Sequence, residues 1–212
     1  MYGFGMKRLW DISPTISAEA LLFPGDAPYR IEWKSRFSDG SPVSLCSISL
    51  SPHIGAHADA PMHYAQGAPS VADLELGPFF GPCRVIHAIG VAPLILPEHL
   101  GRQATHLPGR VLIRSRAAAM KSWSHDFAAV APETIDWLHR QGVVLLGVDT
   151  PSVDPADSVA LPGHNRLHGY DMRVLENLVL DDVAEGDYEL VALPLKLAGA
   201  CASPVRAVLR RL

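Results

Sequence analysis

The segment 53–64, HIGAHADAPMHY, concentrates four side chains that can bind a metal ion or move a proton, and these are His53, His57, Asp59 and His63. Imidazole and carboxylate groups are the usual protein ligands of zinc and related metals, and short spacings let one segment bring several of them to one point. In a helix, His53 and His57 would share one face, whereas in an extended chain all four would lie on one side. Small or apolar residues separate them, so the sequence predicts a partly buried site.

This segment needs further ligands, because a hydrolytic metal site requires three or more fixed ligands and an open position. The second half of the chain supplies three candidates, which are His164, His168 and Glu176. A site built from both segments could hold two metal ions, bridged by a carboxylate such as Asp59. His63 would then be free to carry a proton.

Other catalytic motifs are missing from the sequence, which favours metal-assisted hydrolysis. There is no Gly-x-Ser-x-Gly elbow, no Gly-Lys-Ser/Thr phosphate loop, no dinucleotide glycine fingerprint and no His-Glu-x-x-His helix. An isolated histidine is more often structural than a ligand, so we assign structural or surface roles to His87, His99, His106, His125 and His139. We assign the three cysteines, Cys46, Cys83 and Cys201, to packing.

Composition indicates an ordinary globular protein. The 212 residues are 48% hydrophobic and 19% charged, which predicts one domain spanning 1–212. A net charge of −4 without a basic stripe argues against a nucleic-acid partner. Three widely spaced cysteines indicate no disulfide framework and fit a reducing cytoplasm. Residues 1–11 lack a signal-peptide core, no apolar run is long enough for a membrane span, and residues 1–5 read as a dispensable extension before Met6.

Strands and a few helices are expected to position the site. Strands are predicted at 8–12, 30–37, 43–50 (with a bulge near Cys46 and Ser47), 83–89, 110–115, 143–149, 188–198 and 204–210. Helices are predicted at 132–142 and, more briefly, at 97–101. Met172, Leu175 and Val179 have helical spacing and predict a third helix at 168–179, with Glu176 beside its apolar stripe. Residues 66–82 read as a loop at the mouth of the site. The pattern predicts an α/β domain with a mixed sheet.

The chain resembles the bacterial kynurenine formamidases of the metal-dependent cyclase family. Their pattern His-x-Gly-Thr/Ala-His-x-Asp-Ala-Pro-x-His is met throughout by HIGAHADAPMH at 53–63. The likeness extends to LWDIS at 9–13, PGD at 24–26, SLSPH at 49–53, GPCRVIH at 81–87, DTPS at 149–152 and ASPVRAVL at 202–209. The resemblance implies a swivelling β/α/β fold, a homodimer, and two zinc ions per subunit.

The resemblance also implies roles for individual residues. The implied metal ligands are His53, His57, Asp59 as the bridge, His164 and Glu176, and the implied catalytic acid/base is His63. The implied reaction is hydrolysis of N-formyl-L-kynurenine to L-kynurenine and formate in tryptophan degradation. The substrate's ring would need an aromatic-edged pocket, for which Phe23, Tyr64, Phe79 and Phe80 are candidates.

Three positions depart from the family. Phe23 stands where these enzymes usually have Trp, and Ile54 where they often have Thr. The sequence of segment 157–169 differs from the usual family sequence at the place where the late histidine ligand is expected. His164 is preferred to His168 as that ligand because its twelve-residue separation from Glu176 matches the family. Two alternatives stay open: another cyclase-family amidohydrolase acting on a cyclic imide or related amide, and a non-catalytic metal-binding module. The presence of His63 argues against the second, because a structural metal site needs no acid/base.

Overall fold

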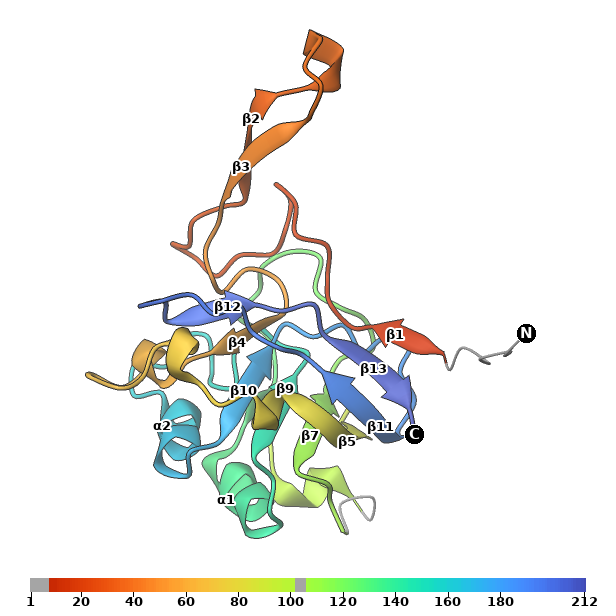
Figure 1. Cartoon of the computed structure of the whole chain (residues 1–212). Helices are drawn as coiled ribbons and strands as arrows, with labels where there is room; N and C mark the ends of the chain where they lie inside the picture. The colour runs from red at the N-terminus through yellow and green to blue at the C-terminus, as the bar shows by residue number, and fades with distance from the viewer. Residues whose placement is uncertain (1–7, 102–105) are drawn as a thin grey trace.

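The structure is a computed structural model that describes residues 8–101 and 106–212. The expected extension over 1–5 lies outside these residues. A mixed sheet of nine strands forms the body, in the order β1-β13-β11-β5-β7-β9-β10-β4-β12 (Figure 1). Its strands are β1 (Leu9–Asp11), β4 (His57–Asp59), β5 (Phe80–His87), β7 (Arg110–Arg114), β9 (Leu145–Val148), β10 (Arg173–Glu176), β11 (Gly186–Val191), β12 (Ala202–Pro204) and β13 (Val208–Arg211). The predicted α/β fold with a mixed sheet is confirmed.

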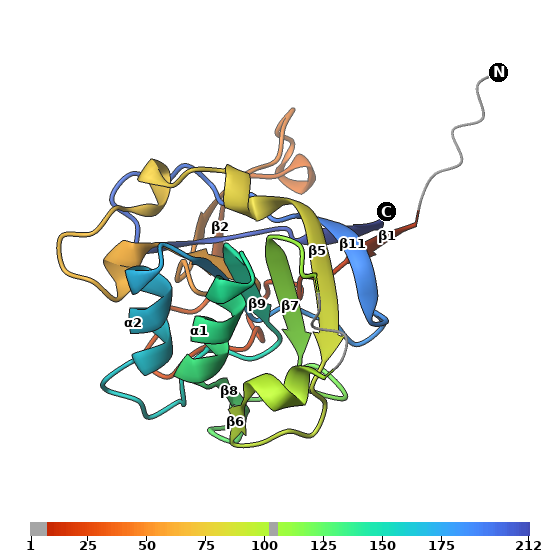
Figure 2. The same ribbon diagram turned by 90° about the horizontal axis from the view of Figure 1, so that it is seen from below.

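Parallel strands form the centre of the sheet and antiparallel strands form both ends. β5, β7, β9 and β10 are parallel, whereas β4 is antiparallel to both β10 and β12. Parallel neighbours need a crossover connection. Two helices serve this purpose, α1 (Pro132–Arg140) before β9 and α2 (Pro162–Gly169) between β9 and β10. They lie side by side over one face of the sheet (Figure 2).

Two hydrophobic clusters lie on opposite faces of the central strands. On β7, Val111 and Ile113 pack in the cluster under the helices, while Leu112 packs in the other cluster. This alternation follows from the two-residue period of a strand. Leu112 shares its cluster with residues of β4, β5, β10, β11 and β13, so the sheet curls around that core.

The remaining elements are short. β6 (Leu94–Ile95) pairs with β8 (Ala129–Val130), and the 3₁₀ turns are η1 (Phe37–Asp39), η2 (Pro61–His63), η3 (Val71–Asp73), η4 (Gly77–Phe79) and η5 (Pro97–Leu100). The predicted helix at 132–142 and the turn at 97–101 are present with slightly shifted ends. The strand expected at 204–210 divides into β12 and β13. Within the described ranges no helix has the length and apolarity to cross a bilayer.

β2 (Arg30–Ser35) and β3 (Leu45–Ser49) form a hairpin that projects from the body (Figure 1). Their register places Ile31 opposite Ile48. The predicted bulge near Cys46 and Ser47 is wrong, because the irregularity lies between Trp33 and Ser35 on the partner strand. A bulge shifts the alternation only of the strand that carries the extra residue, which is β2. The residues of β3 are mostly exposed on both faces, so the pattern of apolar residues there does not report a bulge.

The helix predicted at 168–179 is also wrong. Helix α2 ends at Gly169, and residues 173–176 form β10, which pairs in parallel with β9. Asp171 and Asn177 flank the strand with φ values of 53° and 56°, a conformation that Asp and Asn tolerate better than most residues. All four residues of β10 are buried. The strand has only four residues, RVLE, of which two are apolar, and this is too short a run for a strand period to be separated from a helical one.

Candidate metal centre

The pairing of β4 with β10 brings the side chains of His57, Asp59 and Glu176 together. His53 lies in a loop, His57 and Asp59 lie on β4, and His63 lies in η2. Residues two apart on a strand share a face, so His57 and Asp59 point to the same side. Glu176 of β10 pairs directly opposite His57 and therefore joins them. The cluster segment is thus neither one helix nor one continuous strand.

Helix α2 supplies the fourth group, His164, through its first turn. The carboxylate of Asp154 accepts hydrogen bonds from the backbone N–H groups of Gly163 (2.7 Å) and His164 (3.0 Å). The same carboxylate lies 2.7 Å from Nδ1 of His164. This one side chain therefore satisfies the free N–H groups at the start of the helix and orients the imidazole.

In this cluster, Nε2 of each imidazole lies close to both carboxylates. Nε2 of His57 lies 3.5 Å from Oδ1 of Asp59 and 3.4 Å from Oε2 of Glu176. Nε2 of His164 lies 3.4 Å from Oδ2 of Asp59 and 3.5 Å from Oε1 of Glu176. The side chains are at most 5% exposed. Glu176 is held by the backbone N–H of Val153, which donates to Oε1 at 2.8 Å.

Four buried atoms of this cluster have no hydrogen-bond partner among the residues that the structure describes: Nε2 of His57, Nε2 of His164 and both carboxylate oxygens of Asp59. A buried polar atom without a partner costs about 1–3 kcal/mol. Nδ1 of His57 lies 2.9 Å from the carbonyl oxygen of Gly55, which can only accept, so Nδ1 carries the hydrogen and Nε2 is left to face the carboxylates. The convergence of such electron-pair donors fits a divalent cation.

His53 completes a second group around the same aspartate. Its Nδ1 lies 3.0 Å from Oδ1 of Asp59, and its ring centroid lies 5.1 Å from that of His57. The ligand atoms of His53, His57 and Asp59 lie within 4.8 Å of one another, and so do those of Asp59, His164 and Glu176. Asp59 belongs to both groups, which is the arrangement that a bridging carboxylate requires.

The carboxylates control the protonation of the cluster. Burial disfavours the charged form of each ring, but Asp59 outweighs it and raises the pKa of His53 to about 9. Asp154 and Asp59 likewise outweigh burial and raise the pKa of His164 to about 10. Burial also acts on Asp59, yet the close imidazoles of His164 and His53 hold the pKa of its carboxyl well below the usual range. Without a metal ion, protons therefore occupy nitrogens that could bind one.

His63 differs from the other three histidines. Its side chain is exposed, and its ring centroid lies 4.2 Å from that of His53 and 6.0 Å from that of His164. Desolvation by the surrounding protein lowers the pKa of His63, only partly opposed by the charge of Asp59. This ring lies beside the cluster without facing its carboxylates and suits proton transfer near neutral pH. His168, the alternative late ligand, is exposed on α2 and is absent from both of these ligand groups.

A cavity of about 360 Å³ opens beside the cluster. Its lining combines His53, His57, His63, His164 and Glu176 with residues of two other segments, which include Leu21, Leu22, Phe23, Asp26, Pro155, Asp157 and Leu161. A cavity of this size with apolar walls and a few convergent polar groups suits a small-molecule substrate.

The four aromatic candidates fall in different places. Phe23 lines the cavity and packs edge-on against Trp123, with ring centroids 4.7 Å apart. Tyr64 does not line the cavity, and its ring centroid lies 5.0 Å from that of His164. Phe79 is fully buried in the core and Phe80 is 51% exposed at the start of β5, so the structure does not bring either of them to the cavity.

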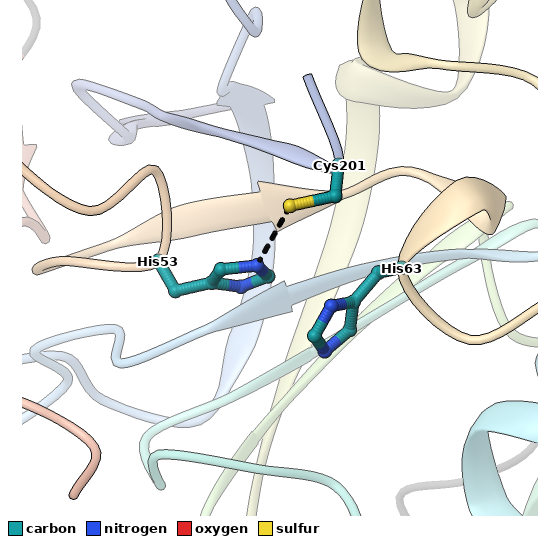
Figure 3. A group of neighbouring side chains, drawn as sticks. All are labelled: His53, His63 and Cys201. Atoms are coloured by element: carbon teal, nitrogen blue, oxygen red, sulfur yellow. Dashed lines mark hydrogen bonds between the residues drawn. The ribbon is translucent and has the colours of Figure 1, made fainter. Parts of the chain in front are cut away.

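Two site residues carry no signal that identifies them in the sequence alone. Asp154 contacts His164 from ten residues away in a loop. Cys201 is not a simple packing residue, because its Sγ lies 3.4 Å from Nε2 of His53 (Figure 3). Cys201 is 148 positions from His53 along the chain, and no local spacing relates them.

Comparison with known proteins identifies the family of the chain. Residues 10–155 match the family model described as "Putative cyclase". Kynurenine formamidase of Bordetella pertussis is 61% identical over 98% of this chain and 100% of its own length, and that of Delftia acidovorans is 53% identical over 97% and 99%. Isatin hydrolase A from Ralstonia solanacearum superposes with a TM-score of 0.79 at 25% identity, covering 97% of this chain and 92% of that one. The chain therefore belongs to the cyclase family, in the branch whose curated bacterial members are named kynurenine formamidase.

Proposed function

We propose that this protein is a zinc-dependent amidohydrolase that converts N-formyl-L-kynurenine and water to L-kynurenine and formate in tryptophan degradation. The observation that carries the proposal is the convergence of four unpartnered buried atoms, on His57, Asp59 and His164, at the edge of a substrate-sized cavity. Relatives with 53–61% identity over nearly the whole chain bear the name of this activity.

The proposed metal ligands are His53, His57, Asp59, His164 and Glu176, with Asp59 shared between two zinc ions. Each ligand offers a nitrogen or oxygen atom, which are donor types that zinc accepts. When bound, the ions would supply Lewis-acid polarisation of the formyl oxygen and activation of water. The protein keeps the donors aimed inward through Gly55 and Asp154, which hold the outer nitrogens of His57 and His164.

His63 is the proposed proton carrier. In the reaction, a bond forms between the water oxygen and the formyl carbon, and the bond between that carbon and the aryl nitrogen breaks. The water proton must reach the departing nitrogen, and His63 is the cluster histidine whose ring is both exposed and free of carboxylate contacts. Its position at the cavity wall lets one imidazole accept the proton and then donate it.

The substrate's aromatic ring is proposed to lie against Phe23. This residue and Leu21, Leu22 and Leu161 provide apolar surface in the cavity. The edge contact from Trp123 fixes the orientation of the Phe23 ring and enlarges the aromatic wall behind it.

The direct test measures hydrolysis of N-formylkynurenine together with metal content. Turnover that disappears with a chelator and returns with zinc is the expected result. Full metal loading with activity only on cyclic imides would select the alternative amidohydrolase instead. Metal loading without any hydrolysis would indicate a non-catalytic metal-binding module.

We also propose a homodimer in the cytoplasm, with the β2–β3 hairpin at the contact. Ile31, Trp33 and Ile48 lie on one face of the hairpin and are 44%, 42% and 59% exposed. Glu32 and Ser47, which pair with each other, lie on the opposite face. An amphipathic hairpin with its apolar face uncovered is typical of a protein contact.

The dimer proposal predicts different effects on the two faces of the hairpin. Ile48→Glu buries a charge at the proposed contact and should shift the protein to monomer in light-scattering chromatography. Ser47→Glu adds the same charge on the polar face and should leave the mass unchanged. A monomeric wild-type protein, or equal behaviour of the two variants, contradicts this part of the proposal.

A further inference from the structure

The His53 ring is held from both sides. Its Nδ1 faces Oδ1 of Asp59 at 3.0 Å, and its Nε2 contacts Sγ of Cys201 at 3.4 Å. Figure 3 shows the thiol pointing at the ring, with His63 also nearby, and the ligand atoms of His53, His63 and Cys201 lie within 4.8 Å of one another. One nitrogen of His53 therefore faces the cluster while the other meets a side chain outside the proposed ligand set.

The other two histidines of the cluster also have one ring nitrogen held by an outer partner and the other facing the carboxylates. Nδ1 of His57 is occupied by the carbonyl oxygen of Gly55, and Nδ1 of His164 by the carboxylate of Asp154. In both cases the free nitrogen, Nε2, faces Asp59. Cys201 occupies the corresponding place beside His53. His53 is also the least enclosed of the three, with its side chain 15% exposed against 2% and 3%, so packing constrains its ring less.

Backbone pairing fixes the position of the thiol. The carbonyl of Cys201 accepts a hydrogen bond from the N–H of Ala60 at 2.9 Å, and the next residue, Ala202, pairs with Asp59 across β12 and β4. The carbonyl of Ala200 accepts from the N–H of Val71 at 2.9 Å. Cys201 is thus anchored on one side to the segment that carries Asp59 and on the other side to the start of η3.

We propose that Cys201 is a positioning residue that holds His53 with Nδ1 directed at the metal centre. This inference rests on the proposed function, because it takes His53 as a metal ligand. With Nδ1 bound to a metal ion, the neutral ring carries its hydrogen on Nε2 and donates it to the sulfur. Outer hydrogen bonds of this kind fix the tautomer and the ring orientation of ligating histidines. Cys201 acts through His53 and does not contact the reacting atoms.

Metal affinity is the appropriate measurement, because it reports the role without depending on turnover. Loss of an outer partner of a ligating histidine weakens metal binding by about 10- to 100-fold. Sulfur is a weak acceptor, so we expect Cys201→Ala to weaken zinc binding by about tenfold in a chelator competition assay. Cys201→Ser keeps a hydrogen-bonding group at the same position and should recover most of the affinity. Cys46→Ala, which removes a cysteine from the distant hairpin, is the matched control and should bind zinc as the wild type does.

A double-mutant cycle separates positioning from a general structural effect. If Cys201 acts through His53, Cys201→Ala should have no further effect on zinc affinity in a His53→Ala background. Thermal unfolding of the metal-free variants checks that each one folds. Wild-type zinc affinity in Cys201→Ala, or an undiminished effect of that substitution without His53, would overturn the inference.

Failure of this inference and failure of the proposed function give different results. A wild-type enzyme that hydrolyses N-formylkynurenine, combined with an unaffected Cys201→Ala affinity, removes the role of Cys201 alone. A wild-type protein that binds zinc without hydrolysing that substrate removes the function, while weaker zinc binding by Cys201→Ala still supports the positioning role.

Discussion

Asp154→Asn is the substitution that most directly tests how the protein prepares its metal centre. The Asp154 carboxylate is 1% exposed and accepts three hydrogen bonds, from the backbone N–H of Gly163 and from the backbone N–H and Nδ1 of His164. Asparagine has the same shape, but it lacks the charge and offers one acceptor oxygen instead of two. It cannot satisfy all three donors.

The expected loss can be estimated from the hydrogen bond to the imidazole. A hydrogen bond to a charged group contributes about 1.5–3 kcal/mol. At about 1.4 kcal/mol per factor of ten, this corresponds to roughly a 10- to 100-fold decrease in metal affinity. Lost outer partners of ligating histidines have effects in this same range. We therefore expect zinc to bind Asp154→Asn about 10- to 100-fold more weakly than the wild type.

Chelator competition at fixed pH measures this difference, and the chain offers a close control. Asp182 is exposed in the turn between β10 and β11, outside the cavity lining, and no hydrogen bond or ion pair from the described residues engages its carboxylate. Asp182→Asn makes the same change in charge and should leave zinc affinity nearly unchanged. The reasoning is refuted if Asp154→Asn binds zinc like the wild type, or if it weakens binding equally when His164 is replaced by alanine.

Three further predictions concern the histidines. His63→Ala should retain its metal content and lose about 10²- to 10⁴-fold in turnover, the usual contribution of a positioned acid/base; unchanged turnover would remove His63 from the mechanism. His164→Ala should release metal in elemental analysis whereas His168→Ala should not, and the opposite result would reassign the late ligand. Metal and protons compete for the nitrogens of His53 and His164, whose pKa values in the metal-free protein are about 9 and about 10. Zinc affinity should therefore rise with pH up to about pH 10, and zinc binding near pH 7 should release about two protons from these rings. Calorimetry in buffers of different ionisation enthalpy counts those protons, and a pH-independent affinity would contradict the protonation scheme.

Local spacing was sufficient to find the first half of the site. His57 and Asp59 are two residues apart, and this places them on one face of any strand they form. The helix at 132–140 was equally accessible, because Pro132 at its start and Gly142 just beyond its end are signals within the segment itself. Features of this kind depend on bonds and contacts between near neighbours, which the linear pattern contains.

The second half of the site depends on pairing between distant segments. Glu176 joins His57 because β10 lies antiparallel to β4, and its predicted placement on a helix was wrong because a short buried segment carries no distinctive period. Phe79 and Phe80 show the same limit, since Phe79 ends η4 and is buried in the core whereas the adjacent Phe80 begins β5 and is half exposed.

The sequence by itself determined which groups are available for metal chemistry, because the types and spacing of 53–63 are a local property. Only the tertiary structure decided which atoms of those groups face one another and what holds them. The outer nitrogens of His53, His57 and His164 are occupied by Cys201, Gly55 and Asp154, and two of these three contacts come from segments ten or more residues away. Such contacts form when strands and helices pack and bury a polar atom that then needs a partner, a requirement that arises from the folded arrangement and not from any one segment.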